Sequence, residues 1–247
     1  MTTAIISALP EEQAGLLALI TNHEHSAQIP CRLEHGLIHK KQVILALAGV
    51  GKVAASSTAT MLIERYKVQR IIFTGVAGAV SEAVNVGDVV VGAEYLQHDM
   101  DASPLFPRYE IPYTGISRYA GDADLIAMIL EALHADLIPC SGSKSFKIHQ
   151  GLILSGDRFV SSAAEVQTLR QELPDALCVE MEGAAVAQVC HNYHIPFAAV
   201  RSISDKADDS AHVDFPKFVS EVAGPMAVKL VDALMQRVAH TKKSIHI

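Results

Sequence analysis

The sequence contains no tryptophan, and aromatic residues make up only 5% of its 247 residues, so aliphatic side chains and alanine must supply most of the core. No apolar run approaches the roughly 20 residues of a membrane-spanning helix, and the apolar segment Ala4–Leu9 is shorter than the apolar part of a signal peptide. Basic residues are few and scattered, 20 Lys and Arg against 27 Asp and Glu. The charge pattern of a nucleic-acid-binding protein is therefore missing, and we expect a protein that binds neither nucleic acid nor membrane.

The cysteine and histidine patterns predict no disulfide framework and no metal site. The four cysteines are far apart in the sequence and form no CxxC pair: Cys31, Cys140, Cys178 and Cys190. Reduced cysteines and a cytoplasmic location are the better interpretation. His98-Asp99-Met100-Asp101 and His191-Asn192-Tyr193-His194 have loosely suitable ligand spacing, but neither matches a known metal-binding motif.

A dinucleotide-binding motif is the one cofactor pattern that the chain partly matches. Gly49, Gly51 and Ala54 follow an apolar run with the spacing GxGxxG/A. That motif also needs an acidic residue at the end of the next strand, where this chain has Thr74-Gly75. A tight turn that requires glycine is the better interpretation, so we expect no cofactor.

Short apolar runs alternate with helical patterns along the chain, which is typical of an α/β fold with a largely parallel sheet. The predicted strands are Ala4–Leu9, Val43–Ala48, Arg70–Thr74, Val89–Val91, Gly151–Leu154, Leu177–Val179 and Phe197–Val200. The predicted helices are Val53–Tyr66, 125–133, Ala184–Tyr193 and 218–234, with an interruption of the last one at Gly224-Pro225. No linker or repeat divides the chain, so we expect a single domain over residues 1–247 with a frayed tail after about residue 238.

One long segment, Asp99–Tyr119, shows no regular pattern. It contains Pro104, Pro107, Pro112 and Gly115. A loop of this length within a compact domain usually forms part of a binding site or an interface.

Polar or glycine-rich segments follow most of the predicted strands. These segments are Pro10–Glu12, Gly49–Lys52, Gly75–Gly78, Ser155–Asp157, Glu180–Glu182 and Arg201–Asp205. In an α/β sheet, ligands bind beyond the carboxyl ends of the strands. Carboxylates, an arginine and glycine turns are therefore expected to meet at one edge of the sheet, as in an enzyme that acts on a small molecule.

Two pairs of carboxylates in these segments have both a structural and a functional interpretation. Glu11 and Glu12 can stabilise a helix N-terminus, but neighbouring helical residues point about 100° apart, so only one can face a pocket. Glu12 is better aligned with the apolar residues that follow. Glu180 and Glu182 would share one face of an extended chain, where two carboxylates suit a ribose diol; capping of the next helix is the alternative.

Asp205 also has two interpretations. It can cap a short helix. It can also belong to a site together with Arg201, which follows a buried strand, because buried charges need partners. The residues alone leave both open.

Taken together and in this order, these segments resemble the 5′-methylthioadenosine/S-adenosylhomocysteine nucleosidases, which have the purine nucleoside phosphorylase-like fold. The resemblance runs from Ala4 to Leu234 and rests on Ala8–Glu12, Gly49–Lys52, Thr74–Gly78, Val86–Asp88, Ser155–Phe159, Val179–Glu182 and Arg201–Asp205. It implies a three-layer αβα sandwich with a central mixed, partly barrel-like sheet, and a homodimer.

The resemblance also implies a reaction, namely hydrolysis of the N-glycosidic bond of 5′-methylthioadenosine, S-adenosylhomocysteine and 5′-deoxyadenosine. Glu12 would activate water, and Asp205 would protonate N7 of adenine with the help of Ser204. Arg201 and Glu180 would order the region of the attacking water. An acid and a base on two sides of the bond both lower the barrier to an oxocarbenium-like transition state.

The substrate-binding residues are assigned by the same resemblance. Phe159 would stack on the base while the backbone of Val160 reads its edge, and Met181 and Glu182 would hold the ribose. The 5′ side would be lined by Leu9, Val50 and Phe215, together with Phe106 and Pro112 of the partner subunit. Ala77 and Gly78 are also expected at the site.

Two departures from the family pattern and three alternatives remain. Val76 stands where the family often has serine, and the proline-rich segment from His98 to Arg108 differs from better-known members. A purine nucleoside phosphorylase is one alternative, although Val76 removes a phosphate-facing hydroxyl and Glu12 would repel phosphate. An aminodeoxyfutalosine-type nucleosidase and a non-catalytic nucleoside-binding module are the others; loss of Glu12 or Asp205 would have favoured the last.

Overall fold

A mixed sheet that closes on itself positions the functional site. The computed structural model describes residues 1–28, 31–136, 146–207 and 218–238. Within this part of the chain ten strands form one sheet, in the order β10-β6-β8-β9-β5-β1-β4-β3-β2, with β7 beside β6. The strands are β1 (Thr3–Ser7), β2 (Thr21–Gln28), β3 (Cys31–Ile38), β4 (Lys41–Leu47), β5 (Arg70–Ala79), β6 (Val89–Gln97), β7 (Tyr119–Ala120), β8 (Ile148–Ser155), β9 (Ala176–Glu180) and β10 (Phe197–Asp205).

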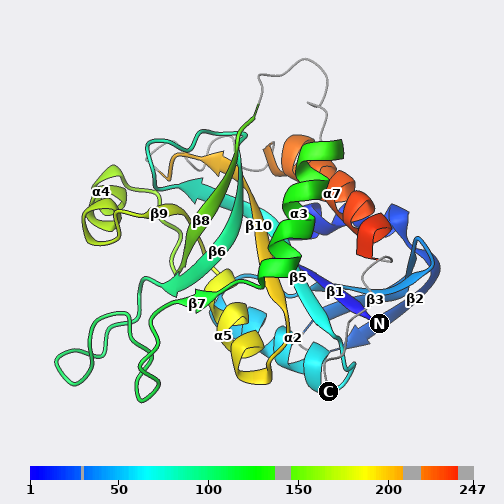
Figure 1. Ribbon diagram of the computed structural model, residues 1–247, viewed down its shortest axis with the longest axis horizontal. Helices are drawn as coiled ribbons and strands as arrows, with labels where there is room; N and C mark the ends of the chain where they lie inside the picture. The colour runs from blue at the N-terminus through cyan, green and yellow to red at the C-terminus, as the bar shows by residue number, and fades with distance from the viewer. Residues whose placement is uncertain (29–30, 137–145, 208–217, 239–247) are drawn as a thin grey trace.

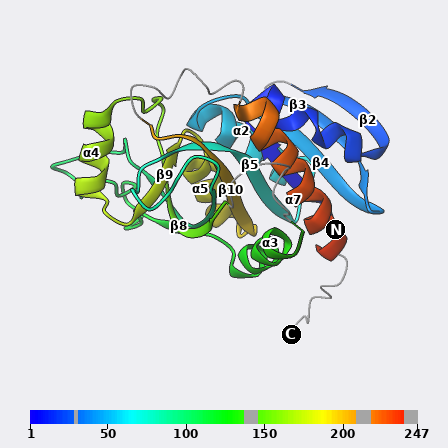
Figure 2. The same ribbon diagram turned by 90° about the horizontal axis from the view of Figure 1, so that it is seen from above.

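Strand β5 is the centre of this sheet, because it pairs with three neighbours. It is parallel to β1 and β10 and antiparallel to β9. Since β10 also pairs with β6, the strands β5, β9, β8, β6 and β10 form a closed ring, and β1, β4, β3 and β2 extend from it. In Figures 1 and 2 the β2–β3 hairpin lies at the end of the molecule opposite α4 (Ala163–Glu172). The predicted mixed, partly barrel-like sheet is confirmed.

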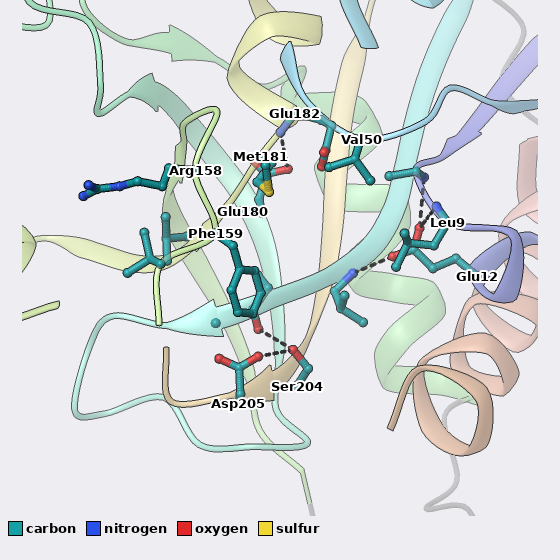
Figure 3. Close-up of a pocket in the computed structure, with 16 residues that line it drawn as sticks. Leu9, Glu12, Val50, Arg158, Phe159, Glu180, Met181, Glu182, Ser204 and Asp205 are labelled. Carbon is teal, nitrogen blue, oxygen red and sulfur yellow. Dashed lines mark hydrogen bonds between the residues drawn. The ribbon is translucent and has the colours of Figure 1, made fainter. Parts of the chain in front are cut away.

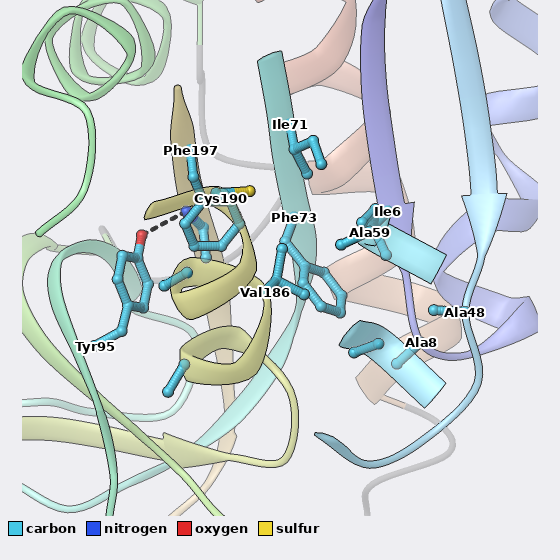
Figure 4. Packing of buried hydrophobic residues seen from close by; sticks show 14 of the residues in the cluster. Ile6, Ala8, Ala48, Ala59, Ile71, Phe73, Tyr95, Val186, Cys190 and Phe197 are labelled. Atoms are coloured by element: carbon cyan, nitrogen blue, oxygen red, sulfur yellow. Dashed lines mark hydrogen bonds between the residues drawn. The ribbon is translucent and has the colours of Figure 1, made fainter. Parts of the chain in front are cut away.

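Helices cover both faces of the sheet, as the alternation of buried side chains along the strands requires. Ile71 and Phe73 of β5 pack with α2 (Lys52–Glu64) and α5 (Gly183–Tyr193), as Figure 4 shows. Ile72 points to the other face and packs with α3 (Ala123–Asp136) and α7 (Gly224–Arg237). The small side chains of α2 and α5, such as Ala59 and Ala184, let these helices lie close to the strands.

The last helix is interrupted where the sequence predicted it. Val219–Ala223 form a π-helical turn, and α7 begins directly after it at Gly224 with Pro225 in its first turn. Proline has no N–H group and is best tolerated in the first turn of a helix. The frayed tail that we expected after about residue 238 lies outside the described residues.

Several elements differ from the sequence-based predictions. The β2–β3 hairpin, α4 and the 3-10 turn Leu16–Leu19 were not predicted. The helix N-terminus that was considered at Glu11 and Glu12 belongs to the short helix α1 (Pro10–Ala14). Both β5 and β10 are about twice as long as predicted, so the polar segments that were expected to follow them belong to the strands. The segment 99–119 contains no helix or strand before Tyr119, as predicted.

Across the described residues, no helix combines the length and the hydropathy needed to cross a membrane.

Candidate functional site

A cavity of about 400 Å³ opens at the carboxyl ends of β1, β5, β9 and β10 (Figure 3). Its walls are formed by Ala8, Leu9, Glu12, Val50, Val76, Ala77, Gly78, Arg158, Phe159, Val160, Val179, Glu180, Met181, Glu182, Ser204 and Asp205. The segments that the sequence analysis singled out are separated by up to about 200 positions along the chain, and the closed sheet brings them to one place. Most of the walls are apolar, and the polar side chains are four carboxylic acids, one serine and one arginine.

Glu12 enters the cavity from α1 and is 3% exposed, whereas its neighbour Glu11 is exposed. Its carboxylate accepts hydrogen bonds from the backbone N–H groups of Ala8 (2.9 Å), Leu9 (3.0 Å) and Val76 (3.2 Å). In α1, Leu9 is the N-cap residue and Glu12 is the N3 residue, so the hydrogen bond between them is the contact of a capping box. The same conformation of Glu12 thus caps the helix and places its carboxylate in the cavity. Burial raises the pKa of Glu12, while the backbone N–H groups and the positive charge of Arg201 oppose this rise.

Arg201 forms a fully buried ion pair behind the cavity. Its guanidinium nitrogen Nη2 lies 2.5 Å from Oε2 of Glu180, and its plane lies over the ring of Phe73, 4.2 Å from the centroid. Gly75 packs so closely against both Arg201 and Glu12 that an added Cβ would lie 2.8 Å and 2.9 Å from their polar atoms. The glycine is therefore required for the approach of β5 to this charge cluster.

Glu180 and Glu182 have different roles, although only one residue separates them. Glu180 ends β9, and its carboxylate accepts the backbone N–H of Gly183 at 2.9 Å, the hydroxyl of Ser155 and the Arg201 guanidinium. Glu180 thus caps α5 from the preceding strand. The helix-capping interpretation applies to Glu180, and Glu182 is left to face the cavity.

Glu182 is 6% exposed and accepts the backbone N–H of Gly51 at 2.8 Å. Burial, and after it the nearby negative charge of Glu180, raise the pKa of Glu182 to about 8, against the opposing effect of Arg201. Oε1 of Glu182 accepts this backbone N–H, and Oε2 is available for a hydrogen bond to a ligand hydroxyl.

Asp205 lies at the opposite end of the cavity and is the last residue of β10, and the short helix that it would cap falls outside the described residues. The Ser204 hydroxyl lies 2.6 Å from Oδ2 of Asp205 and 3.3 Å from the carbonyl oxygen of Ala77. The backbone N–H of Ala207 donates to Oδ1 at 2.7 Å. Gly78 allows this packing, because an added Cβ there would lie 2.9 Å from Oδ1.

Apolar side chains at the mouth complete the cavity. Phe159 is 46% exposed, and in Figure 3 its ring stands between the Glu182 side and the Asp205 side. Val160 is buried beside it, and Leu9, Val50 and Met181 form other parts of the wall. A flat, half-exposed ring over an apolar cavity is suited to stacking on a heterocyclic base.

Three predicted site residues of the described chain do not line this cavity: Arg201, which lies behind it, Phe106 and Pro112. Phe106 and Pro112 lie in the segment 99–119, where the ring of Phe106 packs edge-on against Tyr113 at a centroid distance of 4.9 Å. Phe215 lies outside the described residues. These positions stay predictions.

Some wall residues were not among the predicted site residues. Ala8, Val76, Arg158 and Val179 all line the cavity. Arg158 stands between Asp157 and Phe159 of a segment that the sequence analysis had singled out, so its position in the chain was the available signal. In the part of the chain that the structure describes, no three His, Cys, Asp or Glu side chains are grouped so that they could hold a metal ion.

The fold and the cavity define an α/β protein with a largely apolar pocket for a small molecule, into which several carboxyl groups project. Residues 2–236 match the family described as the Phosphorylase superfamily, and the chain belongs to this superfamily. Three similar solved structures define its place there more narrowly.

The 5′-methylthioadenosine/S-adenosylhomocysteine nucleosidase of Neisseria meningitidis, in complex with methylthio-immucillin-A, is 33% identical; the match covers 96% of this chain and 99% of that chain with a TM-score of 0.87. The Streptococcus pneumoniae enzyme of the same name, with a transition-state inhibitor, is 30% identical, covering 96% and 100% of the two chains with a TM-score of 0.85. The futalosine hydrolase of Helicobacter pylori is 30% identical, covering 96% and 98% with a TM-score of 0.87. The chain is a purine nucleosidase of the 5′-methylthioadenosine/S-adenosylhomocysteine nucleosidase family.

Proposed function

We propose that this protein hydrolyses the N-glycosidic bond of 5′-methylthioadenosine, S-adenosylhomocysteine and 5′-deoxyadenosine, and releases adenine and the 5-substituted ribose. The observation that carries the proposal is the placement of Glu12 and Asp205 at two ends of one cavity, with Glu182 on a third side (Figure 3). This is the arrangement that acid–base cleavage of a glycosidic bond requires.

Glu12 is the base that activates water. Three backbone N–H groups fix its carboxylate and leave acceptor capacity on Oε1, the oxygen that receives a single one of them. Burial raises the pKa of Glu12 toward the range in which a carboxylate is an effective base near neutral pH. Arg201 and Glu180 order this end of the cavity through their buried ion pair.

Asp205 is the acid that protonates N7 of the departing adenine. The Ser204 hydroxyl has one hydrogen and lies within reach of two acceptors, the Ala77 carbonyl and the Asp205 carboxyl. When the Ser204 hydroxyl donates to the carbonyl of Ala77, its oxygen is free to accept a hydrogen bond from the protonated carboxyl group of Asp205. This arrangement supports a protonated Asp205 in the substrate complex.

The remaining wall residues bind the rest of the nucleoside. Glu182 accepts hydrogen bonds from the ribose hydroxyls, with Met181 beside it, and Phe159 stacks on adenine while the Val160 backbone reads its edge. Leu9 and Val50 line the 5′ side. Phe215 belongs to the same side by family resemblance, and Ala77 and Gly78 form another part of the wall.

Water rather than phosphate is the acceptor. Val76 presents an apolar side chain where a phosphate site would need donors, and the Glu12 carboxylate would repel a phosphate dianion. Adenine release from methylthioadenosine should therefore proceed at the same rate with and without phosphate. A rate that increases in proportion to phosphate, with ribose-1-phosphate as product, would contradict the proposal.

An aminodeoxyfutalosine-type nucleoside is a second candidate substrate, because one similar structure is a futalosine hydrolase. The same acid and base would cleave its glycosidic bond. The ratio of kcat/KM for this nucleoside and for methylthioadenosine decides between them, and a ratio above one would make it the preferred substrate.

We also propose a cytoplasmic homodimer in which Phe106 and Pro112 of the partner subunit complete the 5′ side. In this chain the segment 99–119 presents exposed apolar side chains, Leu105 at 84% and Tyr113 at 92%. The three cysteines that the structure describes, Cys31, Cys178 and Cys190, are buried and unbridged, which supports a reducing location.

The homodimer predicts a solution mass near twice 26.5 kDa. Phe106→Ala should raise KM for long 5′ substituents more than for the methylthio group, because the ring would contact the far part of the substituent. A fully active monomer at nanomolar concentration would contradict the dimer.

A further inference from the structure

A ring of hydrogen bonds joins three segments next to the cavity, and the proposed chemistry does not use it directly. Lys52 Nζ lies 2.6 Å from Oδ1 of Asp99 and 3.1 Å from Oε1 of Gln97. The backbone N–H of Asp157 donates to the other oxygen of Asp99 at 2.9 Å. The carboxylate of Asp157 in turn accepts the backbone N–H of Lys52 at 2.7 Å, which closes the ring.

The ring exists because α2 cannot cap its own N-terminus. Its N-cap residue is Gly51, which has no side chain and a φ of 96°. Asp157 supplies the missing acceptor from another segment and places a negative charge at the positive end of the helix. Gly51 is also in close contact with this carboxylate, since an added Cβ would lie 3.1 Å from Oδ1.

Two residues next to the ring in the sequence, Gly51 and Phe159, connect it to the cavity. Gly51, next to Lys52, donates its N–H to Oε1 of Glu182 at 2.8 Å. Phe159 stands two residues after Asp157 on the opposite wall. The position of the Gly51 amide therefore depends on the ring, and the orientation of Glu182 depends on that amide.

We propose that Lys52, Asp99 and Asp157 form a polar clamp that positions Glu182 for ribose binding by holding the Gly51 amide against it. The inference rests on the proposed function, in which Glu182 binds the ribose. The three clamp residues are positioning residues, because they act through Gly51 and do not line the cavity. Asp99 also begins the segment 99–119, so the clamp couples the ribose contact to the place of that segment.

The clamp predicts a change in substrate binding with little change in chemistry. Lys52→Met removes the ion pair and keeps the length of the side chain. It should raise KM for methylthioadenosine roughly tenfold with kcat within about twofold, the effect of one charge-assisted hydrogen bond on binding. Lys52→Arg should restore most of the lost affinity, and Asp99→Asn should act in the same direction as Lys52→Met.

Lys41→Met is the matched control. Lys41 Nζ hydrogen-bonds the carbonyl oxygen of Gln236, beside the end of α7 and away from the cavity, so its removal deletes a comparable contact. It should leave KM unchanged. Equal increases in KM for Lys52→Met and Lys41→Met would overturn the clamp in favour of a general loss of stability.

The pH dependence of kcat/KM in Lys52→Met distinguishes a positioning role from a purely structural one, because loss of stability alone would not shift it. Glu180 from β9, Arg201 from β10, Glu12 from α1 and the Gly51 amide all influence Glu182. The Gly51 hydrogen bond lowers the pKa of Glu182, so its loss in Lys52→Met should shift the acid limb of kcat/KM to higher pH. An unshifted limb would overturn the proposal.

A double-mutant cycle separates the clamp from the proposed function. In a Glu182→Gln background, Lys52→Met should cause no further rise in KM, because the contact through which it acts is already altered. An undiminished rise would overturn the clamp. If Glu182→Gln alone leaves KM and kcat/KM unchanged, the ribose role of Glu182 fails; if Glu182→Gln impairs binding and Lys52→Met does not, only the clamp fails.

Discussion

The two ends of the cavity hold their carboxyl groups by different kinds of donor. At one end, Glu12 receives three backbone N–H groups from the β1–α1 turn and from β5. At the other end, the donors to Asp205 include the backbone N–H of Ala207 and the hydroxyl of Ser204. A backbone N–H can only donate a hydrogen bond, so it favours the ionised carboxylate, whereas a hydroxyl can donate or accept.

This difference matches the division of work in the proposed reaction. The Glu12 end favours a carboxylate that receives a proton from water, although burial makes its charged form costly. The Asp205 end tolerates either protonation state, because Ser204 can reverse its hydrogen bond. Two groups of the same chemistry are thus assigned opposite roles by their neighbours.

The largest expected effect is at the acid end. Asp205→Asn keeps the shape of the side chain but removes the proton that adenine N7 needs, so kcat should fall on the order of 10²–10⁴-fold. The alkaline limb of kcat/KM should disappear, and the melting temperature should change little. Near-normal turnover with a lowered melting temperature would make Asp205 a structural residue. Asp232→Asn serves as the control, because the Asp232 side chain on α7 is partly exposed and does not line the cavity.

The base end should respond almost as strongly. Glu12→Gln leaves a side chain that cannot take a proton from water, so kcat should fall roughly 10²–10³-fold. Because burial raises the pKa of Glu12, its ionised form is lost at a higher pH than for an ordinary carboxylate. Together with Glu182, Glu12 should therefore place the acid limb of the wild-type kcat/KM at correspondingly high pH. Residual activity within a few-fold of wild type would remove the contrast between the two ends.

On the third side of the cavity, Glu182→Gln should lower kcat/KM about 10- to 100-fold above the pKa of Glu182, the effect of charge-assisted hydrogen bonds to a ribose. The fold should remain intact, as checked by circular dichroism. An unchanged kcat/KM in Glu182→Gln would show that Glu182 does not bind the ribose.

Glu182 also predicts a pH dependence of stability. Its pKa rises from about 4.5 to about 8 on folding, so its contribution to stability is present below the lower value and is lost as the pH rises through the higher one. The wild-type melting temperature should therefore fall between about pH 5 and pH 8, and Glu182→Gln should flatten this trend. Parallel curves for the two proteins would show that other groups cause it.

The smallest expected effect concerns the apolar wall beside Glu12. Val76→Ser keeps the backbone N–H that binds Glu12 and adds a hydroxyl near the attacking water. We expect kcat/KM to rise about fivefold, the effect of one ordinary hydrogen bond. A decrease would show that the dry wall itself favours the reaction.

The sequence predicted most of the layers but not the length of the central strands. The prediction ended β5 at Thr74 and β10 at Val200, because glycine and polar residues follow. In the structure the two strands continue side by side, and Asp205 pairs with Gly78. Sheet pairing stabilises an extended backbone that local propensity alone would not favour.

The β2–β3 hairpin was missed for a related reason. Residues 21–28 are mostly polar and show no apolar alternation, so no local pattern marks them as a strand. They form the edge of the sheet, where pairing with β3 on one side is enough. Strand formation there is decided by the partner strand.

The sequence by itself determined the family, the α/β class and the segments that carry chemistry, because these depend on residue types and their order. Only the tertiary structure decided what each carboxylate does. Glu180 and Glu182 are indistinguishable along the chain and both line the cavity, yet Glu180 is bound to Arg201 whereas Glu182 accepts the backbone N–H of Gly51. Likewise, Lys52 and Asp157 lie more than a hundred residues apart and meet only in the folded chain. Hydrogen bonds and charges act over a few ångströms, so the function of such groups is set by neighbours that folding alone supplies.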